Sequence, residues 1–296
     1  MRLDPNRRPE PVRKGIFVAI QYTAKEVVGR LRKEIESGRP LFMPNTGMGL
    51  SAKIQEQGGA DLVCASPTSW WRLRGRGSLT SYLPYSDCNE LVFELVPEIL
   101  AAVKEAPVIS LSGPHNPLLG HREHVKKLWD MGLSGVSQTP IMLFGKEFAE
   151  QMEHLGVGFS QEVAFIRTAH EMNTFTFAYA FTPDEAIAFT EAGVDALSSH
   201  VGATKGGAVG AATTVSLQDA ARMSQEIFDA ATSVRKDLIL FAHGGPMEGP
   251  AEVQYIYDHT TAHGFTGGSS AERMPIEKGI LEATSAFKAV SIPPRK

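Results

Sequence analysis

Eight short apolar runs, rich in residues that favour strands, recur along this chain. Seven of them end on a Gly, Asn, Ser, Thr or His, the eighth ends before a Thr-Pro-Asp-Glu helix start, and most lead into a helix-like stretch. The runs occupy residues 41–45, 62–66, 108–113, 136–139, 175–180, 197–200, 238–245 and 265–269. This alternation is typical of a (β/α)8 TIM barrel of the α/β class, in which functional groups gather where strands end. The polar residues at those ends are therefore the first candidates for function.

The length of the chain leaves room for an addition before the barrel. A barrel takes roughly 250 residues, and the chain has 296. Residues 1–13 are rich in Pro, Arg and charge and offer little to bury. Thr23 and Glu26 have capping-box spacing, which predicts a helix to about Ser37 that closes the bottom of the barrel. We therefore expect an N-terminal arm and capping helix over residues 1–40 and the barrel over 41–292.

Composition narrows the class of protein. With 43% hydrophobic and 21% charged residues, the chain is typical of a globular protein. A net charge of -4 without a basic stripe argues against nucleic acid as a partner. No apolar run approaches the ~20 residues that span a bilayer, and the N-terminus lacks a signal-peptide core. We therefore expect a cytoplasmic protein without a membrane partner, with Cys64 and Cys88 as reduced thiols.

The strongest local signal is the Gly-Gly-Ser-Ser run at 267–270. Gly267, Gly268, Ser269 and Ser270 follow a late strand, where exposed backbone N–H groups can bind a phosphate or carboxylate. Arg273 could add a cationic contact. The alternative is a tight glycine turn with a solvated arginine. We favour anion binding because barrels often bind anions at this corner.

A second Gly-rich loop runs from Asn45 to Ser51, and Ser51 stands where a helix N-cap is expected. Main-chain amides of such a loop can bind a carboxylate. A flexible turn that ends in a cap explains the same residues, and both interpretations stay open.

Three histidines lie at or just past the ends of different strands. His115, His200 and His243 could therefore all face one pocket. Neutral imidazole suits proton transfer near neutral pH, or metal ligation. A hydrogen-bonded wall residue is the alternative for each of them. No HExxH, Asp-x-Asp or Cys-pair spacing specifies a metal site.

Two further features have two interpretations each. Asp87 either caps the following helix or acts as a carboxylate at the barrel rim. Trp70 and Trp71 lie in a long Arg- and Gly-rich loop over residues 67–86 and either close over a ligand or lie at a subunit interface. Aromatic residues are enriched at interfaces, so we favour the interface and expect a homo-oligomer.

Several stretches of the chain resemble a known family. Residues 49–61, the Asp-Cys-Asn-Glu at 87–90 and residues 192–200 are similar to segments of the phosphoenolpyruvate mutase/isocitrate lyase superfamily. Residues 241–246 and 264–273 resemble hallmark stretches of the phosphoenolpyruvate hydrolase-like group, also called TIM-barrel signal-transduction proteins. The resemblance covers roughly residues 15–289. The hallmark stretches add Gly244 and Gly245 to the candidates for substrate binding.

The superfamily resemblance also implies roles for individual residues. Ser51, with the amides of Gly49 and Leu50, matches the anion-binding loop. His200 matches a histidine near the substrate, and Asp87 falls where the mutases have a catalytic carboxylate.

The resemblance fails at the metal site. The mutases have an Asp-x-Asp after the third strand, where this chain has Ser110 and Ser112, and a carboxylate after the fourth strand, where it has Gln138. A hard divalent cation usually needs at least one carboxylate ligand. A divalent metal is therefore possible but lacks its acidic ligands, and no cofactor is predicted. The Lys-Lys-Cys-Gly-His run of isocitrate lyases is absent as well.

These observations predict a hydrolase or lyase for a small anionic oxo-acid such as phosphoenolpyruvate or phosphonopyruvate. His200 or His243 would be the general acid or base, with Asp87 and His115 in support. Carbon–carbon cleavage or enol chemistry is a near alternative, since backbone amides and Arg can replace part of what a metal does for an enolate. A transition metal bound by the three histidines is another. A barrel that senses an oxo-acid without converting it is the alternative from a different class.

Overall fold

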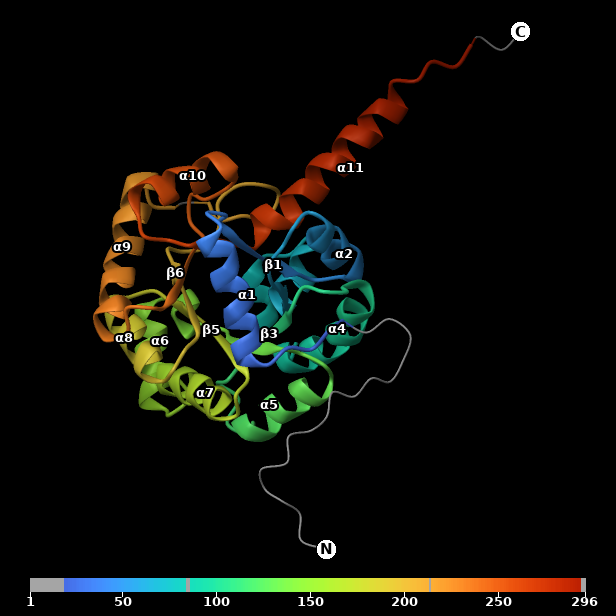
Figure 1. Ribbon diagram of the computed structural model, residues 1–296. Helices are drawn as coiled ribbons and strands as arrows, with labels where there is room; N and C mark the ends of the chain where they lie inside the picture. Colours follow the sequence, from blue (N-terminus) through green and yellow to red (C-terminus); the bar gives the residue numbers. More distant parts are fainter. Residues whose placement is uncertain (1–18, 84–85, 213, 294–296) are drawn as a thin grey trace, which may run out of the picture.

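The computed structural model describes residues 19–83, 86–212 and 214–293, so the arm predicted for residues 1–13 lies outside it. In this part of the chain, parallel strands in sequence order close into a barrel (Figure 1). Leu41 pairs with Gly264 to join the last strand to the first. The strands are β1 (Leu41–Thr46), β2 (Val63–Ala65), β3 (Val108–Ser112), β4 (Gly135–Gln138), β5 (Phe175–Ala180), β6 (Ala196–His200), β7 (Ile239–His243) and β8 (Gly264–Gly267). The predicted (β/α)8 fold is confirmed.

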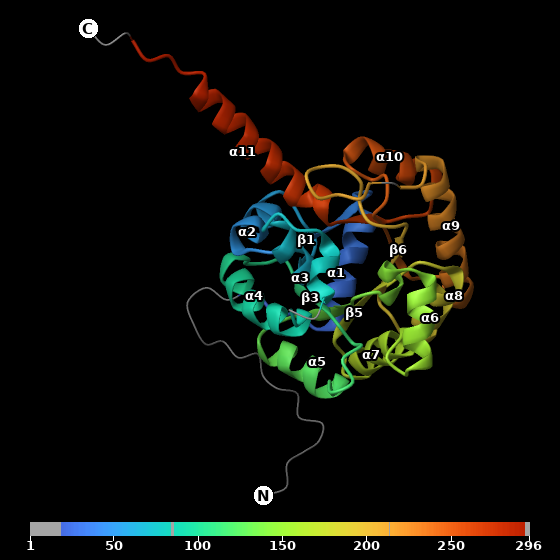
Figure 2. The same ribbon diagram turned by 180° about the vertical axis from the view of Figure 1, so that it is seen from behind.

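Helices alternate with the strands and surround the barrel (Figure 2). Their apolar faces pack on the outward side chains of the strands in one continuous core. The α-helices are α1 (Ala24–Glu36), α2 (Gly49–Gln57), α3 (Pro67–Arg72), α4 (Cys88–Ala102), α5 (His121–Asp130), α6 (Lys146–His154), α7 (Phe159–Glu171), α8 (Pro183–Glu191), α9 (Leu217–Val234), α10 (Pro250–His259) and α11 (Arg273–Lys288), and the 3-10 helices are η1 (Ser78–Tyr82), η2 (Ile141–Phe144) and η3 (Ser269–Ala271).

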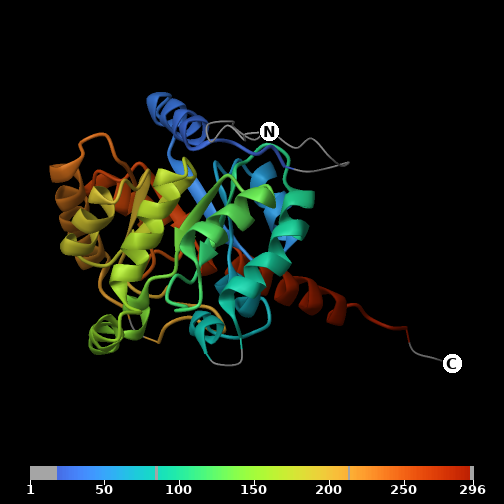
Figure 3. The same ribbon diagram turned by 90° about the horizontal axis from the view of Figure 1, so that it is seen from below.

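Helix α1 covers one end of the barrel (Figures 1 and 3). It begins with the predicted capping box, in which Thr23 and Glu26 satisfy each other's backbone N–H groups. Val27 and Leu31 are fully buried among the inward-facing side chains of the strands. The opposite end, where the strands finish, is thereby left as the open end of the barrel.

The segment after β2 differs from its prediction as a long loop. Residues 67–72 form α3, with Ser66 as N-cap and Pro67 in the first turn, and residues 78–82 form η1. Proline is pre-organised for this position, and the Ser66 hydroxyl accepts a hydrogen bond from the Ser69 N–H. The consequence is that Arg72, at the end of α3, has a fixed place over the barrel.

Helix α11 leaves the ring of helices and extends away from the barrel (Figures 1, 2 and 3). Its first turn is held by Arg273 and Glu277, which contact the loop at Gly206 and Ala208. Further along, Ile280, Leu281 and Phe287 are 63%, 68% and 79% exposed. Among the described helices, none is long and apolar enough to cross a membrane.

Candidate active site

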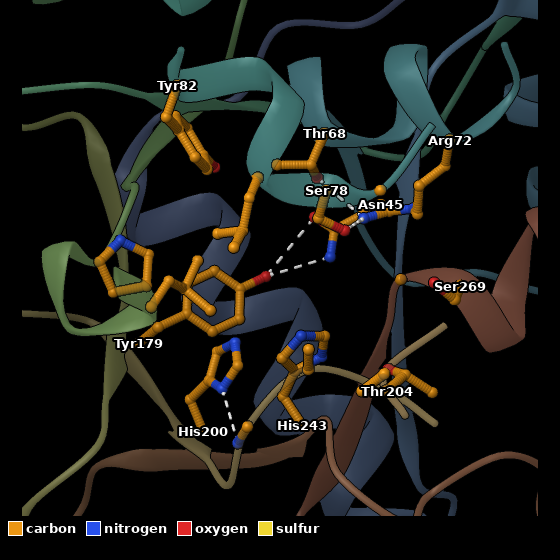
Figure 4. A pocket seen from close by; sticks show the side chains of 18 of the residues that line it. Asn45, Thr68, Arg72, Ser78, Tyr82, Tyr179, His200, Thr204, His243 and Ser269 are labelled. Carbon is orange, nitrogen blue, oxygen red and sulfur yellow. Dashed lines mark hydrogen bonds between the residues drawn. The ribbon is translucent and has the colours of Figure 1, made fainter. Parts of the chain in front are cut away.

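A cavity of about 590 Å³ lies at the open end of the barrel (Figure 4). Strand ends supply its floor, with Asn45, Tyr179, His200 and His243 from β1, β5, β6 and β7. Gly268 and Ser269 follow β8, and Arg72 reaches in from α3. No Asp or Glu is among the described residues that line this cavity. The site therefore offers one cation and several neutral polar groups, which suits an anionic ligand.

His200 and His243 stand side by side on neighbouring strands. They are paired in register, and their ring centroids lie 4.6 Å apart at 74°. Phe181 stacks on His200 at 4.2 Å, and the Tyr179 ring lies against both histidines. This aromatic packing fixes the orientation of both imidazoles at the cavity wall.

Hydrogen bonds assign opposite tautomers to the two rings. The Nδ1 of His200 accepts a hydrogen bond from the Gly202 N–H at 3.1 Å, so a neutral ring carries its proton on Nε2. The Nδ1 of His243 lies 2.7 Å from the Thr266 carbonyl oxygen, which can only accept. Nδ1 of His243 is thus protonated, and its Nε2 has a free lone pair. The pair presents one donor and one acceptor.

Burial keeps both rings neutral. Removal from water, and then the neighbouring His243, lower the pKa of His200 well below its ordinary value. Burial lowers the pKa of His243 to about 4, against the raising effect of the Thr266 hydrogen bond, and the charge of Arg72 lowers it further. An anion bound at Arg72 would offset that charge and raise the pKa of His243, making it a better base.

Arg72 is buried without a counter-ion. Its guanidinium donates to the hydroxyl oxygens of Thr68 and Ser78 at 3.0 Å each and to that of Ser69. Among the described residues it forms no ion pair, and its Nε has no hydrogen-bond partner. Burial accordingly lowers its pKa, against the raising effect of Glu272. Since buried charges are normally paired, Arg72 is prepared for an anion from outside the chain.

Asn45 and Tyr179 complete the floor. The Asn45 amide donates to the Tyr179 phenol at 3.2 Å, and that phenol lies 3.2 Å from the Thr266 hydroxyl. Burial raises the pKa of Tyr179, so the phenol stays protonated and can donate to the Thr266 hydroxyl, to the Asn45 side-chain oxygen or to a ligand in their place.

Only part of the anion-binding site predicted after β8 lies at the cavity. Gly268 and Ser269 line the cavity, whereas Gly267 and Ser270 do not. Arg273 is also outside it: its guanidinium bonds to Glu277 at 2.7 Å and to the Gly206 carbonyl at 2.9 Å. The alternative of a solvated arginine is wrong too, because Arg273 is 2% exposed.

The predicted anion loop after β1 is filled by the chain's own carboxylates. Glu98 accepts a hydrogen bond from the Gly49 N–H at 2.6 Å, and Glu272 accepts one from the Gly47 N–H at 2.9 Å. Leu50 is 64% exposed, and Gly49, Leu50 and Ser51 are not among the cavity residues. Met48, not Ser51, occupies the N-cap of α2. Of this loop, Asn45 alone lines the cavity.

Gly244 and Gly245 support the neighbouring loop rather than line the cavity. Both have positive φ, at 86° and 55°. A Cβ on Gly244 would come within 2.1 Å of the Gly202 carbonyl oxygen, and the Gly245 N–H donates to that same oxygen. These glycines let the loops after β6 and β7 pack backbone to backbone, which holds His200 beside His243.

His115 and Asp87 lie in a second cavity, of about 630 Å³, beside the first. Both ring nitrogens of His115 face backbone carbonyls, of Val157 and Thr139, and its ring is 3.4 Å from the buried Glu162 carboxylate. Asp87 caps α4 through the Asn89 and Glu90 N–H groups. The expectation that His115 shares a pocket with the other two histidines is wrong, because the loop after β3 turns its ring toward α6 and α7. The described structure therefore does not bring the three histidines together in one cavity as ligands for a metal.

The residues at the superfamily's metal-ligand positions do not fit Mg²⁺. The Ser110 and Ser112 hydroxyls lie 3.0 Å apart, and Ser112 also bonds to His124. The Gln138 amide bonds to the backbone of Tyr179 and to Glu162. Neutral groups already paired with one another are poor ligands for a hard cation. Across the described ranges, no group of three or more His, Cys, Asp or Glu is arranged to bind a metal.

Sequence reasoning missed Arg72 and Tyr179, two residues that line the cavity. Arg72 follows Thr68 by four residues, behind a Ser-Pro helix start, and that pattern predicts a short helix with both side chains on one face. Tyr179 ends an alternating Phe175, Phe177, Tyr179 series in which every second residue faces the barrel interior. Because Tyr179 is the last inward-facing residue of this series, its hydroxyl is expected at the open end of the barrel.

Comparison with known proteins gives relatives over nearly the whole chain. The ToMV susceptible protein tm-1(GCR26) of Solanum lycopersicum is 38% identical over 97% of this chain. The putative transcriptional regulatory protein y4pA of Sinorhizobium fredii is 30% identical over 93% of it. The aligned parts make up 37% and 45% of those two proteins, so this chain spans less than half the length of either.

Solved structures share the fold at low identity. A phosphonopyruvate hydrolase in complex with oxalate and Mg++ superposes with a TM-score of 0.58 at 17% identity, covering 88% of this chain and 87% of the other. An oxaloacetate acetylhydrolase superposes with a TM-score of 0.52 at 13% identity, covering 93% and 90%. The sequence profile of the phosphoenolpyruvate hydrolase-like family matches residues 26–290. The chain belongs to the phosphoenolpyruvate hydrolase-like family.

Proposed function

We propose that this chain is a hydrolase or lyase for an anionic oxo-acid, with the chemistry at the open end of the barrel. The observation that carries the proposal is the pairing of His200 and His243 in opposite tautomers beside Arg72, in a cavity whose described lining contains no carboxylate. Proteins of similar fold include a phosphonopyruvate hydrolase and an oxaloacetate acetylhydrolase, whose names identify oxo-acids as their substrates.

Arg72, His243 and His200 have different roles in the proposed reaction. Arg72 binds the substrate carboxylate, and that neutralisation raises the proton affinity of His243. The Nε2 of His243 takes the proton from a hydroxyl group of the substrate or from an attacking water. The Nε2–H of His200 donates to the oxygen that gains negative charge, and Asn45 and Tyr179 offer further donors.

The donor set favours breaking a carbon–carbon bond. The oxygen that lost its proton to His243 becomes the carbonyl oxygen of the departing fragment, and the bonding electrons remain on the oxo-acid fragment as an enolate. The proton held by His243 then goes to the enolate carbon, which gives the oxo-acid with its carboxylate still at Arg72. Each preorganised donor contributes on the order of 3 kcal/mol toward such an oxyanion. Phosphoryl transfer spreads more charge over more oxygens and normally uses a metal ion with several cationic groups, which this donor set does not match.

The test combines ligand binding with turnover. Purified protein is mixed with phosphoenolpyruvate, phosphonopyruvate, oxaloacetate or pyruvate, with and without EDTA. Thermal stability, loss of the acid and release of pyruvate, oxalate or acetate are recorded. We expect stabilisation by at least one acid and turnover that EDTA leaves unchanged. The variant H243N should lose 10²- to 10⁴-fold in rate, the usual contribution of a general base.

The matched control is H154N, since His154 is exposed on α6 and outside the cavity. Turnover equal in wild type and H243N would refute the assignment of the base. Turnover abolished by EDTA and restored by Mg²⁺ would refute the metal-independent mechanism.

A non-catalytic sensor is the second candidate. The observation that favours it is that serines and a glutamine stand where the superfamily has acidic ligands, all paired within the chain. Binding of phosphoenolpyruvate or pyruvate that is Arg72-dependent, with no product formed and no effect of H243N on affinity, would favour this candidate over the enzyme.

We also propose that the protein is a homo-oligomer, and that α11 makes the contact. Besides the exposed apolar side chains of α11, α2 carries Leu50 and Ile54, four residues apart and 64% and 55% exposed. The two helices lie near each other where α11 leaves the barrel (Figures 1 and 2). In a two-fold dimer, α11 of each copy would cover α2 of the other, so both apolar faces become buried.

A further inference from the structure

The candidate active site is much larger than a three-carbon acid. Its volume of about 590 Å³ corresponds to about twenty water molecules at roughly 30 Å³ each. It falls in the range of roughly 300–1,000 Å³ that is typical of pockets for drug-sized ligands. Phosphoenolpyruvate or pyruvate at Arg72 would leave most of this space to water.

The cavity is polar at the floor and largely apolar at the loops above it. The floor residues come from strand ends, as described above. The walls come from the loops after β2, β4, β5 and β6. The polar groups of Thr68, Ser78, Thr80, Tyr82 and Thr204 interrupt an otherwise apolar surface. That surface consists of Leu79, Leu83, Pro140, Met142, Leu143, Phe181 and Val209.

Two of these apolar side chains remain in water. Leu79 is 43% exposed and Leu83 is 39% exposed, although both line a concave surface. Leaving them hydrated forgoes the free energy that their burial would give. A ligand with an apolar group above the floor would cover them.

We infer that the oxo-acid bound here carries an alkyl or aryl substituent larger than the methyl group of pyruvate. The carboxylate and oxo group lie at Arg72, His200 and His243, and the substituent packs between Leu79, Leu83 and the loop at 140–143. This inference rests on the proposed function and specifies the class of its substrate. The space beneath the loops is then filled by the substituent, which excludes water from the two histidines.

The test is a chain-length series measured by calorimetry. Pyruvate, 2-oxobutyrate, 2-oxopentanoate, 2-oxohexanoate and phenylpyruvate share one head group and differ in apolar area. Each buried methylene should tighten binding about fourfold, so 2-oxohexanoate should bind about 60-fold more tightly than pyruvate. Equal affinities for pyruvate and 2-oxohexanoate would overturn the inference.

Variants of the apolar wall show where the substituent binds. L79S and L83S should reduce the gain in affinity per methylene. L118S is the matched control, because Leu118 is 92% exposed in the loop after β3 and outside the cavity. If the gain in affinity per methylene is as large in L79S and L83S as in L118S, the substituent binds elsewhere and the inference is refuted. Since both leucines are partly exposed, the variants should fold, and thermal melting verifies this.

The series separates this inference from the proposed function. Arg72-dependent binding of every acid, with no dependence on chain length, refutes the substituent and leaves the oxo-acid site standing. Failure of all five acids to bind wild-type protein refutes both.

Discussion

Replacing Arg72 by Met should separate stability from ligand binding. In the free protein, the guanidinium makes hydrogen bonds with three hydroxyl groups, each stabilising by about 1–3 kcal/mol, since one partner is charged. Against this stands the desolvation of a buried cation that forms no ion pair and is only partly offset by the charge of Glu272, which costs several kcal/mol. The two contributions are of similar size. We therefore expect R72M to change the free energy of unfolding by less than about 2 kcal/mol.

The effect on binding should be far larger. A carboxylate held by two charge-assisted hydrogen bonds loses about 3–6 kcal/mol when the guanidinium is removed. That corresponds to a 10²- to 10⁴-fold increase in Kd, because each 1.4 kcal/mol is about tenfold. Urea unfolding measures the first quantity, and calorimetry with phenylpyruvate and phosphoenolpyruvate measures the second.

R273M is the matched control. Arg273 is also buried at an end of a helix, but its partners are Glu277 and the Gly206 carbonyl, outside the cavity. We expect R273M to lose about 1–3 kcal/mol of stability, because its ion-pair partner is partly exposed, and to keep its affinity. An R72M protein that binds either acid within fivefold of wild type would refute the assignment of Arg72. So would equal losses of affinity in the two variants.

Four further predictions follow from the same structure. Because the folded-state pKa of His243 is about 4 and its unfolded value 6.5, the folded state binds fewer protons between these values. The contribution of His243 to the free energy of unfolding is therefore fully present above pH 6.5 and should fall by about 3 kcal/mol as the pH falls to 4. If the urea midpoint of H243Q falls as steeply with decreasing pH as that of wild type, this prediction is wrong. G268A would place a methyl 3.4 Å from a guanidinium nitrogen of Arg72 and 3.5 Å from Cε1 of His243, so acid binding measured by calorimetry should weaken at least tenfold while the melting temperature stays near wild type. L31A should lose about 2–5 kcal/mol in urea unfolding, because Leu31 is fully buried at the closed end of the barrel; a smaller loss would mean that α1 contributes little there. Serine at the exposed apolar positions of α11 should leave a folded monomer in light scattering, and an unchanged oligomer would rule out this helix as the contact.

Local patterns along the chain were sufficient to predict the barrel and to place its functional groups at the carboxyl ends of the strands. Apolar strands that alternate with helices commonly form a closed parallel barrel, so the fold could be predicted from local periodicity. The capping box at Thr23 and the cap at Asp87 were readable because both partners lie within three residues. His200 and His243 could be identified as candidates because each is the last residue of a strand.

The partners of the polar groups were decided by the tertiary structure. Glu98 and Glu272 occupy the amides of the loop after β1 from 49 and 225 residues away, and that pairing removes the loop from the site. Arg273 has a counter-ion one turn along its helix, whereas Arg72 is in none of the ion pairs between described residues and is influenced by Glu272 only through its charge. A buried ionic group binds a ligand only if the chain leaves it unpaired. Local periodicity cannot reveal which groups remain unpaired, because their partners come together only when the barrel closes.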